Sequence, residues 1–218
     1  ACAAPGGKTA HLAELLRGEG RLVAVDREAK LGLICEACAR LGHDCVRARA
    51  ADATDGAALR EALREGADDD DDARQPEAEV LADLAVLDAP CTGLGTLRRH
   101  PELRGSLSEA ALAETVETQL AMLEAVSTAV KVGGHLVYSV CSPLPDECEG
   151  VVQRFLAAHG GGWRVCADAG PLVDGRFVVP FAAQGGGGAE EVGVCVRTWT
   201  HEHAGFDSFF AVRLERVG

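Results

Sequence analysis

With 218 residues, 47% of them hydrophobic and 25% charged, the chain has the size and balance of one globular domain, and no apolar run is long enough to cross a bilayer. Nine cysteines without a secretory signal indicate reduced thiols in an intracellular protein, since disulfide-stapled secreted domains are usually short and loop-rich. The net charge of −13 disfavours strong binding of a nucleic acid by this chain, although part of that charge belongs to an acidic insertion at about residues 66–79.

Segments rich in Val and Leu alternate with amphipathic stretches, which is the pattern of a mostly parallel sheet wrapped by helices. The predicted helices are residues 8–17, 28–41, 57–65, 109–131 and 145–159. The predicted strands are residues 21–25, 45–50, 84–87, 135–140 and 208–214. We therefore expect a doubly wound α/β fold, formed as one domain by residues 1–218.

Four side chains that are useful for chemistry follow predicted strands at their carboxyl ends. They are Asp26, Asp52, Asp88 and Cys141. Because ligands of open α/β sheets bind in the crevice outside the carboxyl ends of the strands, we expect these side chains to line one site.

Residues 1–9, ACAAPGGKT, form a glycine turn that leads into the first predicted helix. The closing Gly-Lys-Thr suggests a phosphate-binding loop for ATP, but that motif needs a glycine where Cys2 stands. A glycine turn can instead hold a polar cofactor with backbone N–H groups, and Asp26 is placed to bind the two hydroxyls of a ribose. Together with Asp52, this pattern favours a nucleoside cofactor over the alternative of a plain turn with surface acids.

Cys91 and Cys141 lie in proline-flanked turns, DAPC and VCSP, at the same predicted edge. A buried cysteine is usually a small hydrophobic residue, and this interpretation suits most of the other cysteines. In a turn at the ligand edge, however, a thiol is expected to point into the crevice, where a thiolate with a lowered pKa is a nucleophile.

No metal site is expected. Cys35 and Cys38 have the spacing of a redox or metal pair, but no second pair lies at the distance of a zinc site. His201 and His203 have no neighbours that complete a ligand set, so we expect exposed loop residues there.

A concentrated basic stretch closely follows Cys91 in the sequence. It consists of Arg98, Arg99, His100 and Arg104. A solvated surface is one interpretation, but the position beside the expected site favours phosphate contacts that orient a nucleic acid.

In their order and spacing, these motifs resemble those of the Sun (Fmu or RsmB-like) family of RNA cytosine-5 methyltransferases. The resemblance covers nearly the whole chain and depends on residues 1–9, 88–93, 98–101, 133–143 and 205–210. It implies the class I, Rossmann-like fold of S-adenosylmethionine-dependent methyltransferases and activity on RNA, with ribosomal RNA ahead of transfer RNA. The sequence does not determine the oligomeric state, and a monomer is favoured.

The resemblance also implies a role for each matching residue. Cys141 would be the nucleophile, Cys91 would help to release the product, and Asp88 would lie between the methionine end of the cofactor and the target base. The expected cofactor-binding residues are Ala3, Ala4, Pro5, Gly6, Gly7, Lys8, Asp26, Arg27, Asp52 and Asp88. The expected RNA-binding residues are Arg98, Arg99, His100 and Arg104.

The chain departs from the family pattern at three places. Val140 stands where the family usually has threonine, and Gly105 stands where an aromatic residue is common. The family's first strand, central in the sheet, precedes the position of Ala1, so we expect this chain to leave strand edges exposed and to be poorly stable alone.

Two other functions remain open at this point. Cys91 would be the nucleophile if the chain worked as DNA cytosine-5 methyltransferases do, with their Pro-Cys motif. Alternatively, the chain is a non-catalytic RNA-binding or ribosome-assembly protein that retains the methyltransferase fold.

Overall fold

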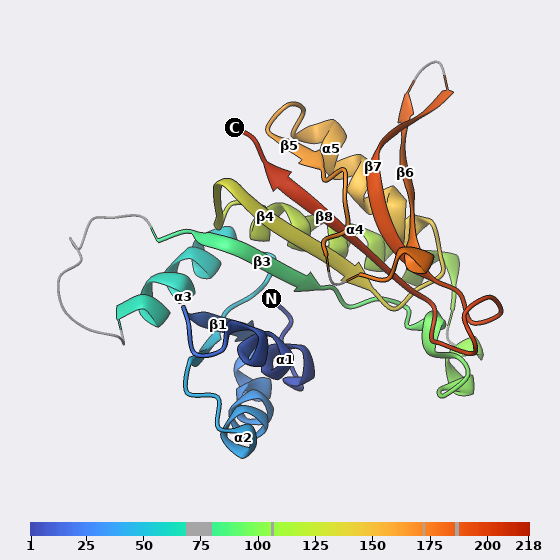
Figure 1. Ribbon diagram of the computed structural model, residues 1–218. Helices are drawn as coiled ribbons and strands as arrows, with labels where there is room; N and C mark the ends of the chain where they lie inside the picture. Colours follow the sequence, from blue (N-terminus) through green and yellow to red (C-terminus); the bar gives the residue numbers. More distant parts are fainter. Residues whose placement is uncertain (69–79, 106, 172, 186–187) are drawn as a thin grey trace.

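The computed structural model describes residues 1–68, 80–105, 107–171, 173–185 and 188–218 (Figure 1). The expected acidic insertion at about residues 66–79 therefore lies almost entirely outside the described residues. Among the helices that are described, none combines the length and the apolar character needed to span a membrane.

Two groups of strands are present in the described residues. β1 (Leu22–Asp26) and β2 (Val46–Ala50) form a parallel pair. The second group is a sheet with the order β3-β4-β8-β7-β6, in which β5 also pairs with β8. The bounds of these strands are Ala82–Asp88 for β3, Val130–Val140 for β4, Trp163–Val165 for β5, Val178–Gly185 for β6, Gly188–Thr198 for β7 and Phe209–Arg216 for β8. β3 and β4 are parallel, whereas β8 is antiparallel to β4.

The helices alternate with the first strands along the chain, as a doubly wound fold requires. Their bounds are Gly7–Leu16 for α1, Leu31–Leu41 for α2, Gly56–Asp68 for α3, Glu109–Ser127 for α4 and Val151–Ala158 for α5. The predicted doubly wound α/β fold is confirmed, with its strands in two groups.

Several predicted boundaries were wrong. The helix predicted over residues 109–131 ends at Ser127, because β4 begins at Val130 rather than at residue 135. The helix predicted from residue 145 begins with a π-helical turn, Asp146–Gly150, before α5. The helix predicted from residue 28 begins with a 3₁₀ turn before α2. Strands β5 to β7 were not predicted, because the glycine-rich sequence around them hides the alternation of polar and apolar residues.

The main core lies between the larger sheet and the helices α4 and α5, which cover one of its faces (Figure 1). Alternate residues of β4 and β8 are fully buried there, together with Leu123 of α4 and Phe155 of α5. Val140 belongs to this set, with no exposed surface, so its side chain faces the core and not the ligand edge. The difference between valine and the family's usual threonine is therefore a difference in the core beside the nucleophile.

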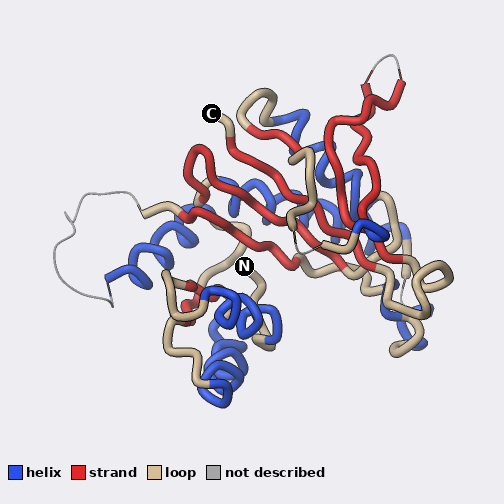
Figure 2. The backbone as a smooth tube through the Cα atoms, viewed as in Figure 1, coloured by secondary structure: helices blue, strands red, loops and turns tan. Residues whose placement is uncertain are grey.

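β1 and β3 are not paired with each other, and a cavity of about 1110 Å³ lies between them. Residues 1–3 cross one end of the cavity, because the Ala1 amino group donates to Val86 O at 2.6 Å and Ala3 N donates to Val25 O at 3.1 Å. Figure 2 shows the N-terminus between the two groups of strands.

Candidate active site

The carboxyl ends of β1, β3 and β4 meet at one edge of the fold. Hydrogen bonds connect the glycine loop to Asp26 at the end of β1 and to Asp88 at the end of β3. The two cysteine loops follow β3 and β4 and touch each other at this edge. The predicted site residues from three strands are thus brought together.

The glycine loop is shaped by one position that only glycine tolerates. Gly6 has φ 107° and precedes α1, and a Cβ atom there would lie 3.0 Å from the Ala37 Cβ and 3.3 Å from the Ile34 Cα. Ala4 N donates to the Asp26 Oδ2 at 2.9 Å, and Arg27 N donates to Oδ1 at 2.8 Å. The buried Asp26 carboxylate therefore fixes the loop on the end of β1.

These residues fit the nucleoside half of a cofactor. Each Asp26 oxygen accepts one backbone N–H and keeps a lone pair that a ribose hydroxyl can use. Asp52 is exposed beyond the end of β2, and hydrogen bonds from Thr54 lower the pKa of its carboxyl group, with a smaller contribution from the charge of Arg27. A carboxylate at this position stays ionised and can accept hydrogen bonds from a ligand.

Asp88 connects the cofactor loop to the two strands that lead to the cysteines. Its Oδ2 accepts from Lys8 Nζ at 2.6 Å, and its Oδ1 accepts from Ser139 Oγ at 3.1 Å. Ser139 was missed in the sequence analysis because an alternating strand gives no sign of which polar side chain faces a ligand. Lys8 also lies 5.8 Å from the ring centroid of Phe209, so it reaches across to the start of β8.

The thiols of Cys91 and Cys141 form the centre of the site, with their Sγ atoms 3.3 Å apart. The hydrogen bond from Cys91 lowers the pKa of the Cys141 thiol to about 7, and the Lys8 charge acts in the same direction, against burial and the Asp88 charge. The same hydrogen bond and burial raise the pKa of Cys91. The lowered pKa of Cys141 favours its thiolate over that of Cys91.

A second residue that the sequence analysis missed is Glu147, which is fully buried beneath the two cysteine loops. It accepts hydrogen bonds from Thr92, Gln119 and Ser142. In the sequence it stands among other acids at the start of a predicted helix, where an exposed side chain is the ordinary expectation.

The four predicted RNA-binding residues are all exposed, in or beside two 3₁₀ turns that follow the Cys91 loop. Arg99 is also tied down, because its Nε and Nη2 donate to Asp207 Oδ2 at 2.9 and 2.5 Å. His100 Nδ1 lies 3.2 Å from a carboxylate oxygen of Glu102. The structure thus gives Arg99 a structural partner in addition to its predicted role, while Arg98 and Arg104 remain exposed at the surface.

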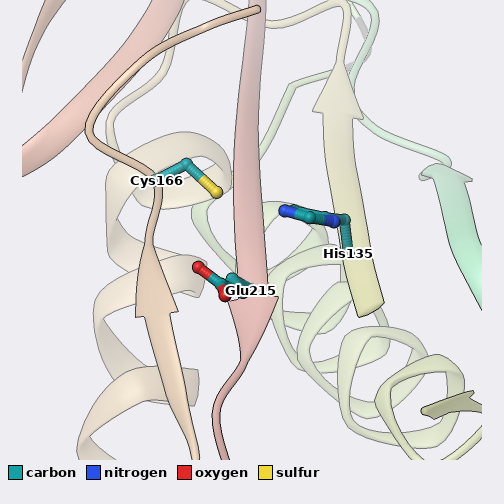
Figure 3. A group of neighbouring side chains, drawn as sticks. All are labelled: His135, Cys166 and Glu215. Atoms are coloured by element: carbon teal, nitrogen blue, oxygen red, sulfur yellow. The ribbon is translucent and has the colours of Figure 1, made fainter. Parts of the chain in front are cut away.

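One group of possible metal ligands occurs among the described residues, and it was not predicted (Figure 3). His135 of β4 and Glu215 of β8 are register partners, and with Cys166 they offer ligand atoms within 4.8 Å of one another. Arg164 already donates to Glu215 Oε2 from Nε at 3.0 Å and from Nη2 at 2.8 Å, which disfavours a cation. His135 is in the middle of β4, whereas Cys141 directly follows its last residue.

The other residues that were weighed as metal ligands are apart from this group. Cys35 is exposed and Cys38 is buried on α2. His201 is exposed as expected, whereas His203 is half-buried, because its Nδ1 accepts from Trp199 N at 2.8 Å and its ring contacts Phe177. The expectation of an exposed His203 was wrong.

Two curated proteins are similar to most of this chain. A curated relative from Synechocystis, described as a probable ribosomal RNA small subunit methyltransferase B, is 39% identical over 164 residues, which are 75% of this chain and 33% of that protein. The ribosomal RNA small subunit methyltransferase B of Escherichia coli K12 is 32% identical over 190 residues, or 85% of this chain and 39% of that protein. The chain thus spans about a third of the length of the curated relatives it matches.

The chain is also similar to solved structures over nearly its whole length. The crystal structure of PH0851 has a TM-score of 0.75 and 30% identity, and the match covers 99% of this chain and 41% of that one. NSun6 from Pyrococcus horikoshii, crystallised with SFG, has a TM-score of 0.70 and 27% identity, with 99% and 46% covered. The fold is that of class I methyltransferases, and the cofactor is S-adenosylmethionine. A family model described as 16S rRNA methyltransferase RsmB/F matches residues 1–215, and the chain belongs to this family.

Proposed function

We propose that this chain forms the catalytic part of an enzyme that transfers a methyl group from S-adenosylmethionine to carbon 5 of cytosine in ribosomal RNA. Membership of an rRNA methyltransferase family supports methyl transfer to RNA. The observation that carries the choice of cytosine carbon 5 is the pair of thiols, 3.3 Å apart, beside the Asp88 carboxylate.

The two thiols suit the chemical requirement of methylation at carbon 5 of cytosine. Carbon 5 of cytosine is too electron-poor to attack a methyl sulfonium, but addition of a thiolate at carbon 6 makes it enamine-like and nucleophilic. Cys141 suits this step, since its lowered pKa favours the thiolate that adds to carbon 6. The cytosine must leave its stack to reach the site, as in other enzymes that act on bases.

Asp88 and Cys91 serve the steps on either side of methyl transfer. The Asp88 carboxyl group, held by Lys8 and Ser139, would hydrogen-bond the cytosine ring and stabilise the adduct. After transfer, a base takes the carbon 5 proton, the electron pair of that C–H bond forms the double bond to carbon 6, and the bond from carbon 6 to Cys141 Sγ breaks with its electron pair on the sulfur, which frees the Cys141 thiolate. The Cys91 thiol would donate a hydrogen bond to the departing Cys141 thiolate, since the two Sγ atoms are already 3.3 Å apart.

The remaining predicted residues would bind the two ligands. S-adenosylmethionine would supply the electrophilic methyl group, with the loop of residues 3–8 around its middle and Asp26 on its ribose. Asp52 and Arg27 would lie near its adenine. Arg98 and Arg104, which are exposed beside the cysteine loops, would contact RNA phosphates.

The test uses RNA that contains 5-fluorocytosine, together with S-adenosylmethionine. Fluorine at carbon 5 cannot leave as a proton does, so a working nucleophile stays covalently bound to the RNA. We expect a trapped band with the unmodified protein and with Cys91→Ala, and none with Cys141→Ala. Cys35→Ala is a matched control, because Cys35 is exposed on α2 away from the site.

The other outcomes separate the rival functions. Loss of the band in Cys91→Ala and its retention in Cys141→Ala would make Cys91 the nucleophile. The absence of a band in every protein, together with no binding of S-adenosylmethionine by calorimetry, would favour a non-catalytic RNA-binding protein.

A further inference from the structure

A single buried carboxylate lies beneath both cysteine loops. The Glu147 Oε1 accepts from Thr92 N at 2.8 Å and from Gln119 Nε2 at 3.1 Å. Its Oε2 accepts from Thr92 Oγ1 at 2.6 Å and from Ser142 Oγ. Thr92 directly follows Cys91, and Ser142 directly follows Cys141. One side chain therefore holds the residues next to both thiols.

Glu147 is itself fixed from three sides. It lies in the π-helical turn, which Gly150 N closes by donating to Pro145 O at 2.9 Å. The hydroxyl of the buried Tyr138 donates to the backbone oxygen of Glu147 at 2.7 Å. The Cys148 thiol donates to Ser142 O at 3.3 Å. Turns of this kind are rare and often occur at functional sites.

Gln119 of α4 connects the carboxylate to the loop on the other side of Cys91. Its Nε2 donates to Pro90 O at 2.9 Å as well as to Glu147. The two loops also touch through the backbone, because Gly95 N donates to Cys141 O at 3.0 Å. Residues on both sides of Cys91 are thus tied, through Glu147, to the residue that follows Cys141.

A role as core filling does not explain this arrangement. A buried carboxylate is costly unless hydrogen bonds compensate its lost water, and an apolar side chain of similar volume avoids that cost. Here each oxygen accepts two donors, and three of the four donors belong to the cysteine loops. The contacts are directed at the residues whose placement sets the distance between the thiols.

We propose that Glu147 is a positioning residue, which sets the separation of the Cys91 and Cys141 thiols by holding both loops on one carboxylate. The inference rests on the proposed function, in which both thiols act on one cytosine. Glu147 does not touch the reacting atoms. Its loss would act on the rate of the chemical step, because small displacements of reacting groups slow such steps strongly.

The comparison of two substitutions at this position tests the proposal. Glu147→Ala removes all four contacts. Glu147→Gln keeps one carbonyl oxygen for Thr92 N and Gln119, and its amide can donate to the Thr92 and Ser142 hydroxyls after these rotate. Glutamine fills the same space as glutamate, whereas alanine leaves a cavity. Thermal unfolding is therefore measured for each variant. Glu117→Ala is the control, on the exposed side of α4.

The first readout does not depend on methyl transfer. The protein is treated with an aromatic disulfide, which takes two electrons from two thiols and leaves one protein disulfide and two aromatic thiols. The measured quantity is the rate at which the Cys91–Cys141 disulfide forms, with the bond identified by mass spectrometry of the peptides. This rate reports how close the loops hold the two thiols. This readout distinguishes failure of the inference from failure of the proposed function.

The second readout is methyl transfer to RNA. In Glu147→Ala we expect kcat to fall by about 10- to 100-fold, with KM for RNA and the affinity for S-adenosylmethionine unchanged. The disulfide should form correspondingly more slowly. Glu147→Gln and Glu117→Ala should return both rates close to those of the unmodified protein.

The proposal is overturned if Glu147→Ala forms the disulfide and turns over at normal rates. It is equally overturned if a folded Glu147→Gln is as slow as Glu147→Ala. Should the alanine variant not fold, Thr92→Val and Ser142→Ala each remove one hydroxyl donor from one loop and keep the carboxylate. Normal disulfide rates in both would then contradict the proposal, and slower rates would support it.

Discussion

The Lys8 ammonium group and the Asp88 carboxylate lie 2.6 Å apart and join the cofactor loop to the strand end that leads to Cys91. Lys8 is half-exposed, with 55% of its side-chain surface accessible, so the pair itself contributes little to folding stability. Its position gives it a larger effect on chemistry, because the Lys8 charge also lowers the pKa of Cys141.

Replacement of Lys8 by methionine should therefore raise the pKa of Cys141, since a nearby positive charge is lost and the Asp88 charge is left unbalanced. The rate of alkylation of Cys141 rises with pH through this pKa, so its midpoint should move to higher pH. The measurement is the iodoacetamide rate at Cys141 against pH. Lys131→Met, at an exposed pair with Asp83, is the control, and an unshifted midpoint in Lys8→Met would contradict the assignment.

Removal of the Cys91 thiol should have an effect of the same sign. The hydrogen bond from Cys91 is the largest cause of the lowered pKa of Cys141, so Cys91→Ala should move the midpoint from about pH 7 towards the ordinary value of a thiol. Single-turnover methyl transfer below pH 7 should then fall more than transfer at pH 9. A profile identical to that of the unmodified protein would show that the two thiols act independently.

Gly95, in the loop that follows Cys91, packs against the backbone of Cys141 and Ser208. A Cβ atom there would lie 2.0 Å from Ser208 O and 2.8 Å from Cys141 O. Gly95→Ala should therefore push the loops apart and lower the free energy of unfolding by about 1–3 kcal/mol, as measured by urea denaturation. Gly160→Ala, where a Cβ would meet nothing within 4 Å, should be close to neutral. Equal effects of the two substitutions would show that the loop yields without strain.

Binding of RNA should depend on the exposed arginines in a way that salt reveals. Arg98→Ala and Arg104→Ala should each weaken RNA binding and reduce the slope of log affinity against log salt by about 1, if each contacts one phosphate. Arg99→Ala should in addition loosen the loop, because it releases Asp207. Titrations at several salt concentrations measure the slopes, and Arg40→Ala, on the exposed surface of α2, serves as the control.

The separation of β1 from β3 leads to an expectation about this chain in isolation. β1 and β3 do not pair with each other across a cavity of about 1110 Å³ with largely apolar walls, an arrangement that favours association of open strand edges. We expect the isolated chain to unfold with poor cooperativity and to associate. A monomer by size-exclusion chromatography with a sharp thermal transition would contradict this expectation.

Much of the fold was predictable from local patterns. Local sequence patterns predicted α1 to α5 and the strands β1 to β4 and β8, because buried and exposed positions recur at a regular spacing within each element. Boundaries failed where local signals conflict, as at Ser127, where helical spacing continues into a strand. The glycine-rich segment from β5 to β7 has no such repeat, and its pairing with β8 depends on residues far away in the chain.

The sequence by itself determined which chemistry is available: two thiols in proline-flanked turns, a glycine loop and acids at the ends of strands. Only the tertiary structure decided how these groups act together. It brings Cys91 and Cys141 to 3.3 Å across fifty residues of chain, turns Val140 into the core, and sets the buried Glu147 beneath both loops. The physical reason is that side-chain periodicity is a local property, whereas hydrogen bonds between loops and the burial of a carboxylate depend on elements that meet only when the sheet has formed.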